Sequence, residues 1–190
     1  MQIKELKNTD AISLSRFFSE LDDDVYKKWN RLGFRVKDID ARKAAEKQCS
    51  IPEKEEKGFV AVAENGEIIG YSYLRLFPEK PVKKHVASLG IVISQKHHSK
   101  GIGRKLMQYM HEWAERNGIK KIWLGTYSSN KNALALYKKY GYKVEGVFMY
   151  EELFDTGWEH VVSMAKFIGS EIKEPEKQRK TIIDGLYAQQ

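Results

Sequence analysis

The sequence has one cysteine, Cys49, and only short uninterrupted apolar stretches. A single thiol excludes an internal disulfide and a multi-cysteine metal site, and its neighbours offer no fixed base that would make it a nucleophile. Uninterrupted apolar stretches such as residues 59–63 are far shorter than the roughly 20 residues that cross a bilayer. Residues 1–5 lack the basic segment and apolar core of a secretory signal. We therefore expect a cytoplasmic protein with no membrane partner.

No concentrated basic stripe is present, although the net charge is +7 and the pI is about 9.3. Lysines and arginines alternate with acids along the whole chain instead of clustering with aromatic residues. This charge favours polyanions in general, including the phosphates of a cofactor, but the pattern predicts no nucleic-acid partner. The 190 residues, 42% of them hydrophobic, are enough for one core.

Hydrophobic periodicity and turn residues divide the chain into strands and helices. The expected strands have alternating or continuous apolar residues and cover residues 2–6, 59–63, 68–76, 85–94, 119–127, 142–154 and 158–168. The expected helices repeat apolar residues every three or four positions and cover residues 12–21, 39–48, 101–117 and 129–140. The charged segment 51–58 is expected to be a loop. We assign residues 1–169 to one domain and residues 170–190 to a charged extension.

The transition from the expected strand 85–94 to the helix at 101–117 has the features of an anion site. The first turn of a helix has backbone N–H groups without internal acceptors, and its dipole favours negative charge. Gly101 and Gly103 would let a pyrophosphate approach the backbone, and Lys100 and Arg104 add positive charge nearby. The spacing of a Walker loop and the third glycine of the dinucleotide fingerprint are both missing.

A second motif follows about thirty residues later, between Asn130 and Tyr142. It matches N-x-x-A-x-x-L-Y-x-x-x-G-[FY] at every specified position. Together with a [QR]-x-x-G-x-[GA] loop from His98 to Gly103, in which His98 replaces the usual glutamine or arginine, it resembles the GNAT superfamily of N-acetyltransferases. The resemblance extends from about residue 2 to residue 168. The turn after Gly141 is nearest to the branch of ribosomal-protein and polyamine acetyltransferases.

The resemblance implies a mixed α/β (α+β) fold, with a mostly antiparallel central sheet of about seven strands flanked by helices. It also implies acetyl-coenzyme A as cofactor. The cofactor-side strand would splay at a bulge, with which Gly90 is compatible. The pantetheine arm would pair with the strand backbone and the pyrophosphate with the following loop; the implied residues are Ile91, Val92, Ile93, His98, Ser99, Lys100, Gly101, Ile102, Gly103 and Arg104. Asn130 and Asn132 are candidates for polar contacts with the cofactor, or are ordinary helix-capping residues.

The same resemblance assigns Tyr137 as the acid that protonates the sulfur of coenzyme A, and the N–H of Ile93 as a donor to the oxyanion. From spacing alone, Tyr137 could equally be a core aromatic. Ser88 stands where many relatives have a glutamate base, so the base is unassigned. A water relay to one of four acidic residues could replace the base, or all four are ordinary surface residues: Glu20, Asp22, Asp23 and Asp24.

The expected reaction is transfer of an acetyl group to a primary amine of a small molecule, protein or peptide, by direct attack in a ternary complex. A non-catalytic module that binds acyl-coenzyme A is the alternative. Neighbouring His97 and His98 lack a third ligand at suitable spacing, so no metal site is expected. Exposed edge strands and the charged extension could support a homodimer, but no feature requires one.

Overall fold

The computed structural model describes residues 1–22, 25 and 41–169 of the chain. In this part of the chain a seven-stranded sheet has the order β1-β2-β3-β4-β5-β7-β6. All neighbouring pairs are antiparallel except β4 and β5, which are parallel. The strands are β1 (Gln2–Glu5), β2 (Glu56–Val62), β3 (Ile68–Arg75), β4 (Val86–Ile93), β5 (Lys121–Tyr127), β6 (Lys143–Phe154) and β7 (Gly157–Phe167). This confirms the expected mixed, mostly antiparallel sheet.

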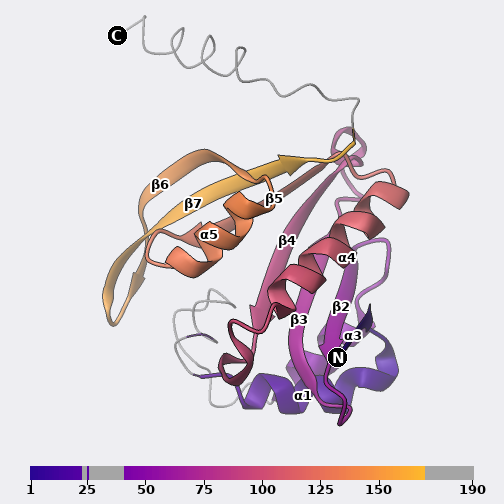
Figure 1. The fold of residues 1–190 in the computed structure, drawn as a ribbon. Helices are drawn as coiled ribbons and strands as arrows, with labels where there is room; N and C mark the ends of the chain where they lie inside the picture. The colour runs from indigo at the N-terminus through magenta and orange to yellow at the C-terminus, as the bar shows by residue number, and fades with distance from the viewer. Residues whose placement is uncertain (23–24, 26–40, 170–190) are drawn as a thin grey trace, which may run out of the picture.

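Helices cover both faces of the sheet (Figure 1). On one face lie α1 (Ala11–Ser19) and α3 (Ala41–Ser50), and on the other lie α4 (Ile102–Arg116) and α5 (Lys131–Lys139). Short 3-10 turns precede α1 and follow β3 and β4, at Asn8–Asp10, Pro81–Lys83 and Gln95–His97. The helix expected at residues 39–48 corresponds to α3, although its first two residues lie outside the described part.

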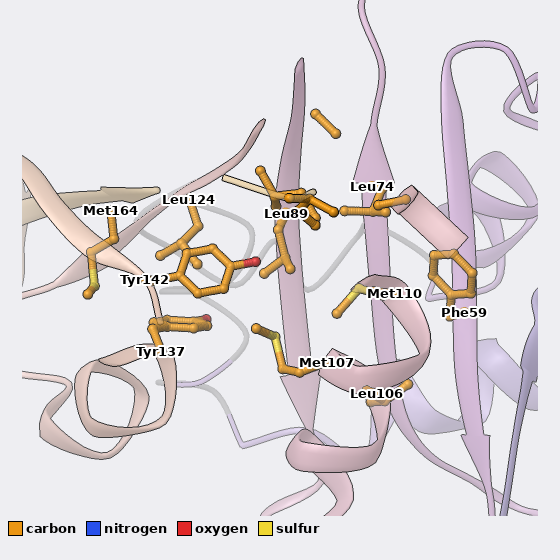
Figure 2. Close-up of a cluster of buried hydrophobic side chains, with 14 of the residues drawn as sticks. Phe59, Leu74, Leu89, Leu106, Met107, Met110, Leu124, Tyr137, Tyr142 and Met164 are labelled. Carbon is orange, nitrogen blue, oxygen red and sulfur yellow. The ribbon is translucent and has the colours of Figure 1, made fainter. Parts of the chain in front are cut away.

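The larger core lies between the sheet and α4. The apolar repeat of α4 consists of Ile102, Leu106, Met110 and Trp113; the first three are buried together with Met107, and Trp113 packs partly buried against the same core. Figure 2 shows Leu106, Met107 and Met110 of α4 on the same face of the sheet as Tyr137 and Tyr142. Tyr137 comes from α5, and Tyr142 comes from the turn after it. A three-to-four-residue apolar repeat therefore produces the helix face that was expected.

A second core joins α1 and α3 to the other face of the same strands. Phe18 of α1 packs its ring edge-on against Tyr71 of β3, with 5.7 Å between ring centroids. Val60 of β2 and Val92 of β4 belong to the same cluster. Alternate residues of each strand thus serve opposite cores, as the period of two in a strand requires.

The prediction of a loop over residues 51–58 is wrong at its end, because β2 begins at Glu56. Glu56 and Lys57 are buried despite their charges, at 5% and 6% exposure. Each has ionic partners: Arg75 binds Glu56 at 3.0 Å, and Glu5 and Glu53 bind Lys57 at 2.8 and 2.7 Å. Tertiary pairing therefore allows charged residues in a strand that the local composition disfavours.

Gly90 causes no shift of register between β3 and β4. The pairs run without interruption from Gly70–Ile93 to Arg75–Ser88, with Tyr73 opposite Gly90. The expected splaying of the cofactor-side strand is present on its other side, toward β5, but the bulge expected at Gly90 is absent from this ladder. The predicted extension at residues 170–190 lies outside the described residues.

Candidate functional site

The principal cavity begins where β4 and β5 separate. Their parallel pairing ends at Ser88 and Trp123, whereas the two strands continue to Ile93 and Tyr127. Figure 1 shows the two strands close together at one end and diverging toward the other. A cavity of about 860 Å³ occupies this separation and is lined by residues of β3, β4, β5, α4 and α5. That volume is large enough for a sizeable ligand.

The separation leaves backbone groups of β4 facing the cavity. Successive residues of a strand direct their N–H and C=O groups to opposite edges. The N–H of Ser94 bonds to Ile69 of the β3 side, and the C=O of His85 accepts from Lys121 of β5. Odd-numbered residues of β4 therefore point toward β5, and among the described residues no strand pairs with Ile91 and Ile93 on that edge. The N–H and C=O of Ile91 and the N–H of Ile93 are available to an extended ligand, whereas the C=O of Ile93 lies 3.1 Å from Nε2 of His98.

This alternation refines the prediction for Val92. Its N–H and C=O groups are directed to β3, where it pairs with Tyr71. Its side chain is buried in the core formed with α1 and α3, at 5% exposure, although it also contributes to the cavity wall. Val92 can thus shape the cavity but cannot pair its backbone with a ligand in the separation.

The loop before α4 contains two left-handed residues, Ser99 with φ of 61° and Gly101 with φ of 75°. The latter is the N-cap of α4, and the first helical bond runs from the N–H of Lys105 to the C=O of Gly101. The preceding N–H groups, those of Ile102, Gly103 and Arg104, have no acceptor within the helix. All three residues line the cavity, so a helix N-terminus borders it, as expected for an anion site.

Gly101 and Gly103 are needed for different reasons. A Cβ on Gly101 would meet nothing within 4 Å, so only its positive φ requires glycine. A Cβ on Gly103 would lie 3.0 Å from Cδ1 of Ile93 and 3.2 Å from Cδ2 of Leu136. Gly103 therefore allows α4 to approach β4 and α5 closely, a packing role that the motif alone does not reveal.

The lining of the cavity is basic and has no acidic residue among the described part of the chain. Arg104 and Lys139 contribute cationic side chains on the α4 and α5 side. His98 also lines the cavity, and its Nε2 donates to the C=O of Ile93 at 3.1 Å, which ties the loop to the end of β4. Lys100 was predicted to belong to this set but does not line the cavity.

Tyr137 of α5 lies at the cavity wall, with a side chain that is only 6% exposed. Its ring packs against Tyr142 at 5.8 Å between centroids, and Figure 2 shows the two rings together beside Leu124 and Met107. Burial, and secondly the nearby phenol of Tyr73, raise the pKa of Tyr137 above its ordinary value. At neutral pH the phenol is therefore protonated and can serve as a proton donor.

Asn130 and Asn132 both line the cavity near the start of α5. The side-chain oxygen of Asn130 accepts from the N–H of Ala133 at 3.1 Å and caps the helix. The capping interpretation thus describes the contact that Asn130 makes. Contacts of either residue with a cofactor stay a prediction.

The opposite face of the sheet contributes a second part of the lining, which sequence reasoning missed. It consists of side chains on the α1 face of β3, β4 and β5: Tyr73, Arg75, Ser88, Trp123 and Tyr127. Only Ser88 had been considered, as the residue in place of a glutamate. Alternation along β3 places Tyr73 and Arg75 on one face, but nothing in the sequence shows that this face borders a cavity.

The acids considered as a base or relay are not brought to the cavity by the described structure. Glu20 lies in a smaller neighbouring cavity, 3.7 Å from Lys96, and Asp22 is exposed. Asp23 and Asp24 lie outside the described residues. The identity of a base therefore stays open.

The described residues contain neither a membrane-spanning helix nor a cluster of metal ligands. None of the helices there has the length and apolar character that a membrane span requires. No group of three or more histidine, cysteine, aspartate or glutamate residues in the same ranges is arranged to hold a metal ion.

Known proteins with similar sequences include acetyltransferases. The chain is 29% identical over 83 residues to the L-amino acid N-acetyltransferase AaaT of Escherichia coli, an alignment that covers 43% of this chain and 51% of that protein. The chain thus spans about half the length of this curated relative.

Solved structures share the fold over nearly the whole chain. A phosphinothricin acetyltransferase from Sinorhizobium meliloti, in complex with AcCoA, has a TM-score of 0.75 at 18% identity and covers 91% of this chain and 93% of its own. A spermidine N-acetyltransferase from Vibrio cholerae, in complex with CoA and spermine, has a TM-score of 0.71 at 19% identity and covers 87% of this chain and 94% of its own.

The sequence also matches a family as a whole. The pattern of the Acetyltransferase (GNAT) family matches residues 14–142, which include α4, α5 and the separating strands β4 and β5. This range contains both motifs described above. The chain belongs to the acetyltransferase (GNAT) family.

Proposed function

We propose that this protein transfers an acetyl group from acetyl-coenzyme A to a primary amine, by direct attack of the amine in a ternary complex. The observation that carries the proposal is a single cavity bordered by both faces of the sheet at the separation of β4 and β5. One face supplies a helix N-terminus and Tyr137, and the other supplies a separate set of side chains. Two substrates can therefore meet at the separation without a covalent enzyme intermediate.

The residues on the α4 side fit the chemistry of coenzyme A. The N–H groups at the start of α4, together with Arg104, suit a pyrophosphate. The outward-facing backbone groups of Ile91 and Ile93 suit the amides of a pantetheine arm. Acetyl-coenzyme A supplies an activated thioester, and the chain's own residues would orient it and exclude water.

Two groups of the chain would act at the reacting atoms. The N–H of Ile93 is directed into the separation, where it would donate to the developing oxyanion of the thioester carbonyl. The hydroxyl of Tyr137 would donate its proton to the leaving sulfur. Burial raises the pKa of Tyr137, so at neutral pH the phenol keeps its proton until the leaving sulfur takes it.

The substitution Tyr137→Phe tests the catalytic part of the proposal. We expect acetyl-coenzyme A to bind nearly normally, while free-thiol release with an amine panel falls by about 10²- to 10⁴-fold, the usual contribution of a general acid. Tyr109→Phe is the matched control, because Tyr109 packs on Phe59 and does not line the cavity. Unchanged turnover in Tyr137→Phe would remove this residue from the mechanism.

The same measurements distinguish an enzyme from a non-catalytic module. Binding of acetyl-coenzyme A without acetylation of any amine would favour the module. The names of the similar proteins cover an L-amino acid, phosphinothricin and spermidine as acceptors, so they support an amine in general. We propose a cytoplasmic location and leave a homodimer open to measurement of mass in solution.

A further inference from the structure

A row of side chains crosses the sheet at the point where β4 and β5 separate. In register, Glu56 of β2 pairs with Arg75 of β3, Arg75 with Ser88 of β4, and Ser88 with Trp123 of β5. Side chains in register share one face of a sheet, and this row is on the α1 face. Arg75, Ser88 and Trp123 line the cavity. Ser88 is small, so in this row no bulky side chain of β4 stands between Arg75 and Trp123.

The guanidinium group of Arg75 is held by two contacts. Its Nε and Nη2 donate to Oε2 of Glu56 at 3.1 and 3.0 Å, and it lies over the ring of Tyr73, with 5.4 Å from Cζ to the centroid. The Glu56 side chain is 3% exposed, whereas that of Arg75 is 53% exposed. Buried Glu56 therefore orients a guanidinium whose Nη1 side is not used by the pair.

The ion pair still presents a cationic side to the cavity. Glu56 is on β2, one strand farther from the separation than Arg75, and neighbouring strands are about 4.8 Å apart. Glu56 does not line the cavity, and no other carboxylate of the described residues does. A ligand in the separation would therefore approach the guanidinium before the carboxylate that partly neutralises it.

This charge distribution discriminates between classes of amine. A second ammonium group, as in a polyamine, would face Arg75 without an acidic partner among the lining residues described, and like charges repel. A carboxylate next to the amine would instead accept hydrogen bonds from the guanidinium fork. We infer that the acceptor is an amino acid whose carboxylate binds Arg75 while its amine reaches the separation of β4 and β5. The inference rests on the proposed function and specifies its acceptor.

Acceptors that differ only at the carboxylate test the inference. Thiol release from acetyl-coenzyme A would be measured with L-methionine, L-leucine and L-phenylalanine, each beside its carboxamide and its decarboxylated amine, and with spermidine. We expect kcat/KM for the best acid to exceed that of its amide by about 10- to 100-fold, the effect of a charge-assisted hydrogen bond. In Arg75→Gln this ratio should fall to near one.

A second variant controls for the buried carboxylate. Arg75→Gln leaves Glu56 without its cation, which destabilises the fold, so the double variant Glu56→Gln with Arg75→Gln replaces the ion pair by a neutral pair. The acid-to-amide ratio should also be near one in the double variant. Its unfolding midpoint and its affinity for acetyl-coenzyme A would show that the fold and the cofactor site remain.

Three outcomes would contradict, in turn, the amino-acid acceptor, the role of Arg75 and the proposed function. Better turnover of amides, decarboxylated amines or spermidine than of the acids would overturn the inference and leave the proposed function in place. An acid preference that persists in both variants would overturn the role of Arg75. If no acceptor is acetylated although acetyl-coenzyme A binds, the proposed function fails and the inference fails with it.

Discussion

The ring of Tyr73 lies directly over Gly90, its cross-strand partner on β4. A Cβ on residue 90 would lie 2.6 Å from the Tyr73 hydroxyl oxygen and closer still to the ring carbons. The glycine thus makes room for an aromatic ring at the separation of β4 and β5. From there the phenol contributes to the raised pKa of Tyr137, which lines the same cavity.

We expect Gly90→Ala to destabilise the protein by about 1–3 kcal/mol, the usual cost of forcing extra atoms into a packed site. In a protein that already contains Tyr73→Ala, adding Gly90→Ala should cost much less stability, because the clash with the ring is then absent. Chemical denaturation measures both values. Gly146→Ala is the control, since a Cβ there meets nothing within 4 Å and the φ is not positive. Equal effects at positions 90 and 146 would show that the contact with Tyr73 is unimportant.

Gly103→Ala should weaken acetyl-coenzyme A binding through packing. The added methyl would push against Ile93 and Leu136 and displace the start of α4 from β4. We expect the KM for acetyl-coenzyme A to rise about 10-fold or more, as for a misplacement of about 1 Å at a binding site. Combining Gly103→Ala with Ile93→Val removes the nearest methyl group and should restore part of the affinity. An unchanged KM in the single variant would argue against close packing at this position.

Arg104→Gln should raise the dissociation constant of acetyl-coenzyme A and reduce its dependence on salt. The loss of one charged contact to phosphate corresponds to about 1.5–3 kcal/mol, or roughly 10- to 100-fold. Lys105→Gln is the matched control, because this neighbour is exposed and does not line the cavity. Titration calorimetry at two ionic strengths would compare them, and similar losses in both variants would indicate only a general effect of net charge.

His111 makes the fold sensitive to acid. Burial, and secondly the charge of Lys166, lower the pKa of His111 to about 4, and its Nε2 lies 2.9 Å from the Tyr142 hydroxyl. Between pH 6.5 and 4 the unfolded state binds a proton that the native state does not. The free energy of unfolding should therefore fall as the pH falls through this range, by up to about 3 kcal/mol.

The variant His111→Gln isolates this contribution, because glutamine does not titrate. Stability measured by denaturation at pH 7, 6, 5 and 4 should depend less steeply on pH in the variant than in the wild type. Parallel pH profiles for the two proteins would assign the acid sensitivity to other groups.

The elements on the α4 side of the cavity were predictable because their signals are local. A strand, a glycine turn and an amphipathic helix follow one another between Ile91 and Arg104, and neighbouring residues in a chain stay neighbours in space. The second motif places Tyr137 on a helix, and the structure brings that helix to the same cavity. Periodicity also located the sheet strands to within a few residues, except where Glu56 and Lys57 are buried through distant ionic partners.

The sequence by itself determined the order of the elements, the family and the loop that precedes α4, because periodicity, turn residues and motif spacing depend on residues near one another. Only the tertiary structure decided that Tyr73 covers Gly90 and that Arg75 lines the same cavity as Tyr137. Those positions depend on strand register and on which face of β3 borders the cavity. Register is set by packing between segments far apart in the chain, so no local pattern contains it.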